Sequence, residues 1–348
     1  MMETERATQM SFAALAIFSG CFLIGTMLLT WAVLLYLRRK AILDMPNHRS
    51  SHAVPTPRGG GLAVTPLLVV MVGAVFLWSG DTDIARWGML AAAVVLGGLS
   101  WLDDRHDLSP AIRFACQFIA VIVGVFAIDG PVLQGLVPMW LDRILVVLAW
   151  VWFLNLFNFM DGIDGITGVE AGSIGAGVFV LALLAPLPEF IDLGYIGLGV
   201  LAIMAGFLIW NWHPAKLFLG DVGSVPLGFV LGWLLFELAA RGAWMPALIL
   251  PSYYLVDATF TLIKRGLRRE KVWQAHREHF YQQATQRSMS HAQVSSLITL
   301  CNIALIIIIF LPVGIAPWVR LVPAVIVVGL LIWAMKCLPV KGAPSKPQ

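Results

Sequence analysis

Six aspartates lie in three short polar stretches of a chain that is otherwise largely apolar. They are Asp103, Asp104 and Asp107 in WLDDRHDLS, Asp161 and Asp164 in NFMDGIDGITG, and Asp221 in FLGDVGS. Several anions gathered at a membrane interface need a compensating cation, because desolvation and mutual repulsion both oppose ionisation. Oxygen ligands, with no Cys/His ligand set in these loops, favour Mg²⁺ or Mn²⁺ over zinc. The alternative for any single aspartate is an ordinary helix cap.

Glycines accompany Asp161, Asp164 and Asp221. A backbone without Cβ atoms can approach a ligand closely and can adopt positive φ. The GDVGS stretch also precedes an apolar run, so we expect it to open a helix whose N–H groups can hold phosphate oxygens. The alternative is that the glycines only end helices or pack spans closely, and for the GGG at 59–61 both interpretations stay open.

Basic side chains supply the opposite charge. His276, Arg277 and His279 in AHREHFYQ are donors suited to a diphosphate. Lys216 and His213, which lie near FLGD, could serve the same purpose or extend to the membrane interface. The alternative for AHREHFYQ is a solvated loop. Carboxylates, a hard metal, glycine loops and basic donors together fit phosphoryl-type transfer between a nucleotide-linked donor and a lipid.

The elements that must hold these residues are membrane-spanning helices. The chain has 348 residues, of which 59% are hydrophobic and 12% charged, and this balance excludes an ordinary soluble protein. Apolar runs that can cross a hydrocarbon layer about 30 Å thick recur along its length. We predict an all-α, polytopic bundle of about eleven transmembrane helices. They cover residues 11–37, 61–79, 84–101, 112–128, 141–157, 171–186, 191–210, 223–240, 244–263, 292–311 and 320–337.

Basic residues also indicate the orientation. The first apolar run lacks a convincing cleavage site and is followed by Arg38, Arg39 and Lys40, so we expect a retained anchor with a periplasmic N-terminus and a cytoplasmic C-terminus. The connections on the cytoplasmic side would then carry most of the lysines and arginines. We interpret 1–348 as a single transmembrane domain. Its expected cytoplasmic catalytic loops are residues 38–60, 102–113, 158–170, 211–222 and 264–291.

With these loops assembled, the chain resembles the polyprenyl-phosphate N-acetylhexosamine-1-phosphate transferases of glycosyltransferase family 4. The resemblance rests on VPTPRGGG, WLDDRHDLS, NFMDGIDGITG, FLGDVGS and AHREHFYQ, which follow one another on consistent loops. Each motif alone is weakly specific, whereas the five in this order cover nearly all of the chain. AHREHFYQ is most similar to the O-antigen-initiating branch and differs from the three-histidine run of the peptidoglycan translocase.

The resemblance implies roles for the residues around the metal and the nucleotide. Asp221 would coordinate Mg²⁺, with Asn158 as its helper. Asp164 would contact the uracil, and Asp161 would lie beside it, near the metal and the phosphates, as a catalytic residue.

The same resemblance implies roles for the remaining polar residues. Asp103 and Asp104 match the catalytic pair that would handle the lipid phosphate. His276, Arg277 and His279 match the loop that would grip the diphosphate and help to select the sugar.

The implied reaction is attack by undecaprenyl phosphate on the β-phosphorus of a UDP-N-acetylhexosamine, which releases UMP. The donor sugar would be N-acetylglucosamine or a 6-deoxy relative such as N-acetylfucosamine or N-acetylquinovosamine. The product would start O-antigen or another cell-surface polysaccharide in lipopolysaccharide biosynthesis. The enzyme would lie in the bacterial cytoplasmic (inner) membrane with its active site facing the cytoplasm. Members of the family are often dimers, so the resemblance leaves a homodimer open, and a nucleic-acid partner is not expected.

Two other functions remain as alternatives. A polytopic transporter for an anionic solute would place polar residues near the bilayer midplane and pair broken helices in two halves. A non-catalytic scaffold would bind polyprenyl phosphate or partner enzymes. Asp257, inside the ninth predicted span, is either functional or a partner of Arg265 or another loop cation. Glu170 and Glu237 are expected at the membrane interfaces.

Overall fold

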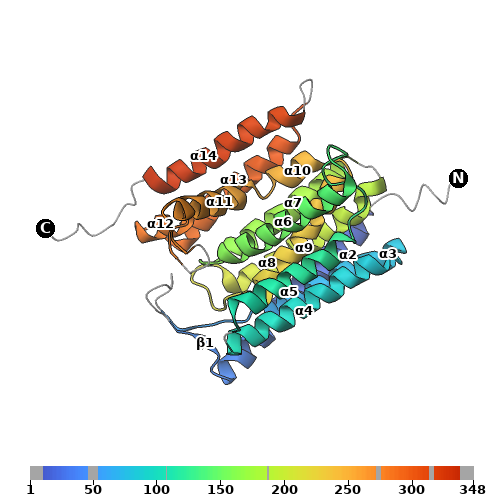
Figure 1. Ribbon diagram of the computed structural model, residues 1–348. Coiled ribbons are helices and arrows are strands. Elements are labelled where there is room, and N and C mark those ends of the chain that lie inside the picture. Colours follow the sequence, from blue (N-terminus) through green and yellow to red (C-terminus); the bar gives the residue numbers. More distant parts are fainter. Residues whose placement is uncertain are drawn as a thin grey trace.

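The computed structural model describes residues 11–45, 54–106, 108–185, 188–271, 276–312 and 317–337, and these form a helical bundle (Figure 1). Within these ranges, nine helices are long and apolar enough to cross a membrane. They are α2 (Phe12–Arg39), α3 (Gly61–Ser79), α4 (Ile84–His106), α6 (Met139–Phe159), α7 (Ile166–Leu184), α8 (Ile191–Asn211), α9 (Asp221–Ala240), α13 (His291–Ile309) and α14 (Leu321–Cys337), the last with a preceding turn. The all-α, polytopic prediction is therefore confirmed.

The other two predicted spans are shorter helices. The run at 112–128 corresponds to α5 (Pro110–Val125). The run at 244–263 is divided into α10 (Trp244–Ile249) and α11 (Ser252–Leu267), with Pro251 at the junction. Proline has no N–H for the helical ladder, which explains the interruption. Composition predicted the apolar run correctly, but it could not show that two helices share it.

The remaining elements are small. A hairpin pairs β1 (Leu43–Asp44) with β2 (Thr56–Pro57), and α12 (Phe280–Gln286) is a short amphipathic helix. Two 3₁₀ turns, η1 (Pro188–Phe190) and η2 (Pro317–Arg320), precede α8 and α14. The hairpin and α12 lie at the same end of the bundle, on the left in Figure 1.

The centre of the bundle is α9. Nearly all of its side chains are buried, and it contacts α3, α4 and α6. Helices α7 and α8 form the most extensive pair, and α2 packs against α8. Helices are the natural outcome because every backbone N–H and C=O in a hydrocarbon layer must be bonded within the protein. Because α9 is central, its first residue, Asp221, lies where several other helices end.

Two glutamates predicted to lie at the membrane interfaces are buried inside the protein. Glu170 and Glu237 are both fully buried. Asn302 donates to Glu170 at 2.8 Å, and Arg241 forms an ion pair with Glu237 at 2.8 Å. A carboxylate can be buried when it is paired or hydrogen-bonded. Asn302 comes from a distant segment that sequence spacing does not reveal, whereas Arg241 lies only four residues after Glu237.

The polar connections are also shorter than predicted. The loop expected at 158–170 extends only from residue 160 to 165, because α6 ends at Phe159 and α7 begins at Ile166. Helix α9 begins at Asp221, so the prediction that GDVGS opens a helix is confirmed. Asp107 and parts of the 38–60 and 264–291 loops lie outside the described residues. The cytoplasmic orientation stays a prediction.

Candidate active site

Two glycine-containing motifs form one backbone unit at this end of the bundle. Phe218 N–H donates to the Pro57 carbonyl at 2.9 Å, and Gly60 N–H donates to the Phe218 carbonyl at 2.8 Å. Gly61 N–H donates to the Leu219 carbonyl at 2.9 Å. A Cβ atom on Gly61 would lie 2.1 Å from the backbone nitrogen of Gly223, so the first turns of α3 and α9 touch directly. For the last glycine of GGG, close packing is therefore the confirmed interpretation.

This backbone unit places Arg58 among carboxylates. Its Nη2 lies 2.6 Å from Asp221 Oδ1 and 3.4 Å from Asp104 Oδ1. Burial acts to lower the pKa of the Arg58 guanidinium, but the charges of Asp221 and Asp104 outweigh it and raise the pKa above its usual value. Arg58 is thus a permanent cation in the site, and the sequence analysis did not single it out.

Asp161 lies near the same group. Thr167 Oγ1 donates to its Oδ1 at 2.6 Å. Burial raises the pKa of Asp161 to about 6, and the hydrogen bond and the charge of Arg58 only partly oppose this. The negative charge of Asp221 raises the pKa further. Three carboxylates, those of Asp104, Asp161 and Asp221, therefore surround one guanidinium.

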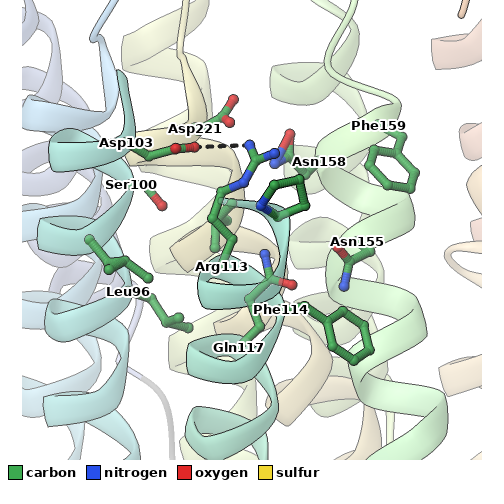
Figure 2. A pocket seen from close by; sticks show the side chains of 13 residues that line it. Leu96, Ser100, Asp103, Arg113, Phe114, Gln117, Asn155, Asn158, Phe159 and Asp221 are labelled. Carbon is green, nitrogen blue, oxygen red and sulfur yellow. Dashed lines mark hydrogen bonds and ion pairs between the residues drawn. The ribbon is translucent and has the colours of Figure 1, made fainter. Parts of the chain in front are cut away.

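A cavity of about 240 Å³ opens beside this cluster. Figure 2 shows that it brings together side chains from α4, α5, α6 and α9. Its lining includes three residues predicted to act together, Asp103, Asn158 and Asp221. The lining also contains polar residues that were not predicted, namely Ser100, Arg113, Gln117 and Asn155. The predicted convergence of separate loops on one cleft is confirmed for this set.

Asp103 and Asp104 are adjacent but do different things. Asp103 lines the cavity, and its two oxygens accept from Arg113 Nη1 at 2.9 Å and from Leu108 N–H at 2.8 Å. Asp104 instead faces Arg58. Successive residues on a helix point in directions about 100° apart. The end of α4 therefore contacts Arg113 through Asp103 and Arg58 through Asp104. Ser109 is the N-cap of α5, and its side chain accepts from Ile112 N–H. Arg113 therefore lies one turn after the start of this helix.

The residues present fit a hard divalent cation. Asp221 and Asn158, the predicted metal ligands, line the same cavity and offer carboxylate and amide oxygens. Asp104 and Asp161 add negative charge close to Asp221, more than the single guanidinium of Arg58 offsets. This donor set is typical of Mg²⁺ rather than zinc.

Asp164 is buried and bound within the protein. Its Oδ2 lies 2.6 Å from His213 Nδ1 and accepts from Ala215 N–H at 3.1 Å, and its Oδ1 lies 3.3 Å from His291 Nδ1. Burial acts to raise the pKa of Asp164, but the hydrogen bonds from both histidines outweigh it and hold the pKa below its ordinary value. Asp164 is not among the residues that line the cavity. Its contact with uracil stays a prediction.

The sequence analysis did not predict that two histidines would gather around Asp164. Ligand atoms of Asp164, His213 and His291 lie within 4.8 Å of one another. The three side chains come from separate loops and helix starts, which sequence spacing does not reveal. Their hydrogen bonds account for the arrangement, because they stabilise the ionised carboxylate without a metal.

The late loop is anchored by Asp257. Its Oδ1 accepts from Phe280 N–H at 3.0 Å and lies 3.1 Å from His279 Nδ1, and its Oδ2 accepts from Tyr281 N–H at 3.3 Å. Asp257 is fully buried and His279 is 2% exposed. Of the two interpretations left open for Asp257, pairing with the late loop matches this geometry, and the partner is the His279 imidazole.

The other basic residues have the following positions. His276 is half-buried, and burial lowers its pKa to about 4, with His279 and Arg265 adding to the effect. The Arg277 carbonyl accepts from Gln286 Nε2 at 2.9 Å. The Lys216 ammonium lies over the Trp210 ring, 5.3 Å from its centre. The substrate-binding roles of His276, Arg277, His279 and Lys216 stay predictions.

Known proteins were compared with the chain. Residues 86–239 match the family described as "Glycosyl transferase family 4". A "Probable undecaprenyl-phosphate N-acetylglucosaminyl 1-phosphate transferase" of Bacillus subtilis (strain 168) is 26% identical over 261 residues, which are 72% of this chain and 71% of the relative. A "Phospho-N-acetylmuramoyl-pentapeptide-transferase" of Chlamydia pneumoniae is 26% identical over 262 residues, 64% of this chain and 74% of the relative.

A third relative is more similar over a shorter stretch. A "Decaprenyl-phosphate N-acetylglucosaminephosphotransferase" of Mycobacterium tuberculosis (strain CDC 1551 / Oshkosh) is 33% identical over 216 residues, 56% of this chain and 52% of the relative. The family 4 segment runs from α4 to α9 and contains Asp103, Asn158 and Asp221. Arg58 and the late loop lie outside it, and Arg58 reaches the site from the preceding part of the chain.

The unpredicted site residues differ in whether the sequence contained a signal that could have identified them. Arg58 precedes three glycines, and an arginine beside backbone that can approach closely was an available signal. Arg113 and Gln117 are four residues apart and so share one face of a helix. Nothing in the sequence alone, however, showed that this face would meet Asp103 and Asn155 across a cavity.

Proposed function

We propose that this protein transfers an N-acetylhexosamine 1-phosphate from a UDP-sugar to a polyprenyl phosphate and releases UMP. The observation that carries the proposal is the cavity that joins Asp103, Asn158 and Asp221 at the polar end of an apolar bundle. The relatives support it, since all three are named as transferases and two of the names include a polyprenyl phosphate. No specific observation favours the transporter or the scaffold.

In the proposed reaction, an oxygen of the lipid phosphate attacks the β-phosphorus of the donor. A new P–O bond forms, the bond from the β-phosphorus to the bridging oxygen breaks, and UMP leaves with the bonding electron pair. Arg58 pairs with Asp221 and Arg113 pairs with Asp103, and both guanidinium groups can balance charge on the phosphates. Positioning and electrostatics carry this chemistry because phosphoryl transfer needs little covalent help from the protein.

We further propose that Asp221 and Asn158 hold Mg²⁺. When bound, the ion would neutralise charge on the diphosphate and improve the leaving group. Asp103 was predicted as a catalytic residue, and its contacts favour a positioning role, because both oxygens accept hydrogen bonds from the protein. A base is not required at neutral pH, since the second pKa of a phosphate monoester is about 6.

The decisive experiment uses the purified full-length protein with radiolabelled UDP-N-acetylglucosamine, undecaprenyl phosphate and MgCl₂. The expected result is label that extracts into organic solvent, together with stoichiometric UMP. Addition of EDTA should stop the reaction. If no UDP-N-acetylhexosamine yields extractable label, while label from a soluble anion accumulates inside proteoliposomes, the transporter alternative replaces this proposal.

The finer assignment is that the enzyme starts O-antigen or a related surface polysaccharide, with its active site facing the cytoplasm. It is supported by the similarity of AHREHFYQ to the O-antigen-initiating branch. A panel of UDP-N-acetylglucosamine, UDP-N-acetylfucosamine, UDP-N-acetylquinovosamine and UDP-muramoyl-pentapeptide tests it. Turnover of the muramoyl donor in preference to the others would refute the assignment.

A further inference from the structure

Gln117 is a buried polar side chain to which the reaction described above gives no role. It lies on α5, four residues after Arg113 and therefore on the same face of the helix. It is 7% exposed, and its Oε1 has no hydrogen-bond partner among the described residues. A buried amide oxygen without a partner is destabilising, and in native proteins such a group usually has a functional reason.

The unpartnered group points into the cavity. Figure 2 shows the carboxamide of Gln117 below Arg113, and Asn155 on the neighbouring helix α6. Asn155 Nδ2 already donates to the Val151 carbonyl at 2.8 Å. Apolar side chains complete this part of the wall, including Leu96, Phe114 and Val225. Polar groups inside an apolar wall suit a ligand that joins a polar head to a hydrocarbon chain.

The position of Gln117 within its helix indicates how such a ligand would arrive. Phe114 and Ile119, also on α5, are 53% and 61% exposed. Large apolar side chains that are exposed on an apolar helix of a polytopic protein face lipid. A UDP-sugar, which is soluble and highly charged, belongs instead at the polar end near Arg58 and Asp161. Phe114 also lines the cavity, so the wall that carries Gln117 includes a lipid-facing side chain.

We propose that Gln117 binds the phosphate monoester of the membrane-embedded acceptor lipid. Its carboxamide nitrogen can donate to a P–O oxygen of the doubly ionised phosphate, and its Oε1 can accept from the P–OH of the singly protonated form. The side chain therefore matches both protonation states of a phosphate monoester, whose second pKa is about 6. Arg113, oriented by Asp103, neutralises the charge from the polar side. Asn155 offers a further polar contact on the opposite wall. This inference rests on the proposed function, because it identifies the acceptor's place in that site.

The test separates binding from stability and from turnover. Purified full-length protein, without UDP-sugar, is titrated with undecaprenyl phosphate, and the bound fraction is measured by native mass spectrometry. Gln117→Leu should weaken this affinity about ten-fold, the value of one hydrogen bond to a charged group. The same substitution should leave the thermal midpoint of the lipid-free protein unchanged or higher, because it removes a buried polar atom that lacks a partner.

A second variant provides the matched control. Gln134 Nε2 donates to the Ala239 carbonyl at 2.7 Å, at a turn outside the cavity lining. Gln134→Leu should therefore lower the thermal midpoint and leave the affinity for undecaprenyl phosphate as in the wild type. This crossed pattern would not arise if both glutamines were only structural.

Two ligand controls identify what is recognised. Undecaprenol, which lacks the phosphate, and inorganic phosphate, which lacks the chain, should both bind at least about ten-fold more weakly than undecaprenyl phosphate. Equal competition by inorganic phosphate would overturn the lipid assignment. A lower thermal midpoint of Gln117→Leu with unchanged lipid affinity would overturn the role of Gln117. If the wild type binds the lipid phosphate but transfers no sugar, the proposed function fails while this inference stands.

Discussion

Single residues in the site are distinguished by their partners rather than by their type. Asp103 holds Arg113, Asp104 faces Arg58, and Asp221 contacts Arg58 while lining the cavity. A carboxylate whose two oxygens both accept hydrogen bonds has little capacity left for a ligand. We therefore expect substitutions of these aspartates to differ in severity, although all of them remove one negative charge.

Asp221→Asn should lower turnover by at least about 100-fold, because a neutral amide is a weaker ligand for a hard cation than a carboxylate. The initial rate of UMP release at saturating MgCl₂ measures this. Asp83→Asn, at the start of α4 and remote from the cavity, is the matched control and should keep the wild-type rate. Near-normal Mg²⁺-dependent turnover by Asp221→Asn would refute the assigned metal ligand.

The His276 side chain should make stability depend on pH. Its pKa falls from the ordinary 6.5 to about 4 on folding, so the unfolded chain binds a proton at a pH where the folded protein does not. The stability that this group contributes is complete above pH 6.5 and is lost as the pH falls toward 4. After allowance for solvent screening, the effect is on the order of 1 kcal/mol.

Thermal midpoints measured from pH 4 to pH 7.5 test this, with His276→Gln compared against the wild type. The variant should lose less stability than the wild type in the acidic half of the range. Parallel curves for the two proteins would show that His276 has no part in the dependence.

Among the elements, the contact between α3 and α9 is the tightest constraint on the site. Gly61→Ala would force a methyl group against the backbone of Gly223, which must move because backbone cannot rotate away as a side chain can. We expect a loss of about 1–3 kcal/mol in unfolding free energy and a reduction in activity, since Arg58 and Asp221 flank this contact.

Gly98→Ala is the control for the preceding substitution. Gly98 lies in α4, and a Cβ atom there would meet nothing within 4 Å. Alanine favours helix over glycine by up to about 1 kcal/mol, so this variant should be as stable as the wild type or more so. For both variants, chemical denaturation in micelles measures the unfolding free energy, and UMP release measures the activity. Equal stability of the two variants would contradict the close packing of α3 on α9.

The anchoring of α12 by Asp257 gives a prediction for local dynamics. Asp257→Ala removes the acceptor of the Phe280 and Tyr281 amides, so hydrogen exchange at these two positions should accelerate about 10-fold or more. Asp192→Ala, which breaks an ion pair with Arg241 elsewhere in the bundle, should leave both amides as protected as in the wild type. Unchanged exchange in Asp257→Ala would show that another group holds the loop.

For the whole molecule, the orientation in the membrane can be tested by labelling. The positive-inside rule predicts that the connection before α4 faces the periplasm and the one after α11 faces the cytoplasm. In a variant without native cysteines, Asp83→Cys should react with a membrane-impermeant maleimide in intact cells. Arg269→Cys should react only after permeabilisation, and the reverse pattern would invert the predicted topology.

How much of this could be predicted from sequence depends on the range of the interactions. Helix α9 starts at Asp221 as predicted, because apolar runs and glycines are local signals. The placement of Asp103, Asn158 and Asp221 on one cavity followed from their shared end of the bundle. In contrast, the contact of Arg86 with Glu237 and the contact of Arg58 with Asp221 join residues more than a hundred positions apart. No pattern in a single chain encodes such pairings directly.

The backbone pairing of residues 57–61 with residues 218–223 also limits how this protein can be recombined with its relatives. A chimera that takes only the first loop, or only the start of α9, from a relative would combine two backbone segments that do not match each other in shape. Exchanges that carry both segments at once should give folded hybrids. The two segments therefore have to be exchanged together, although about 160 residues of chain separate them.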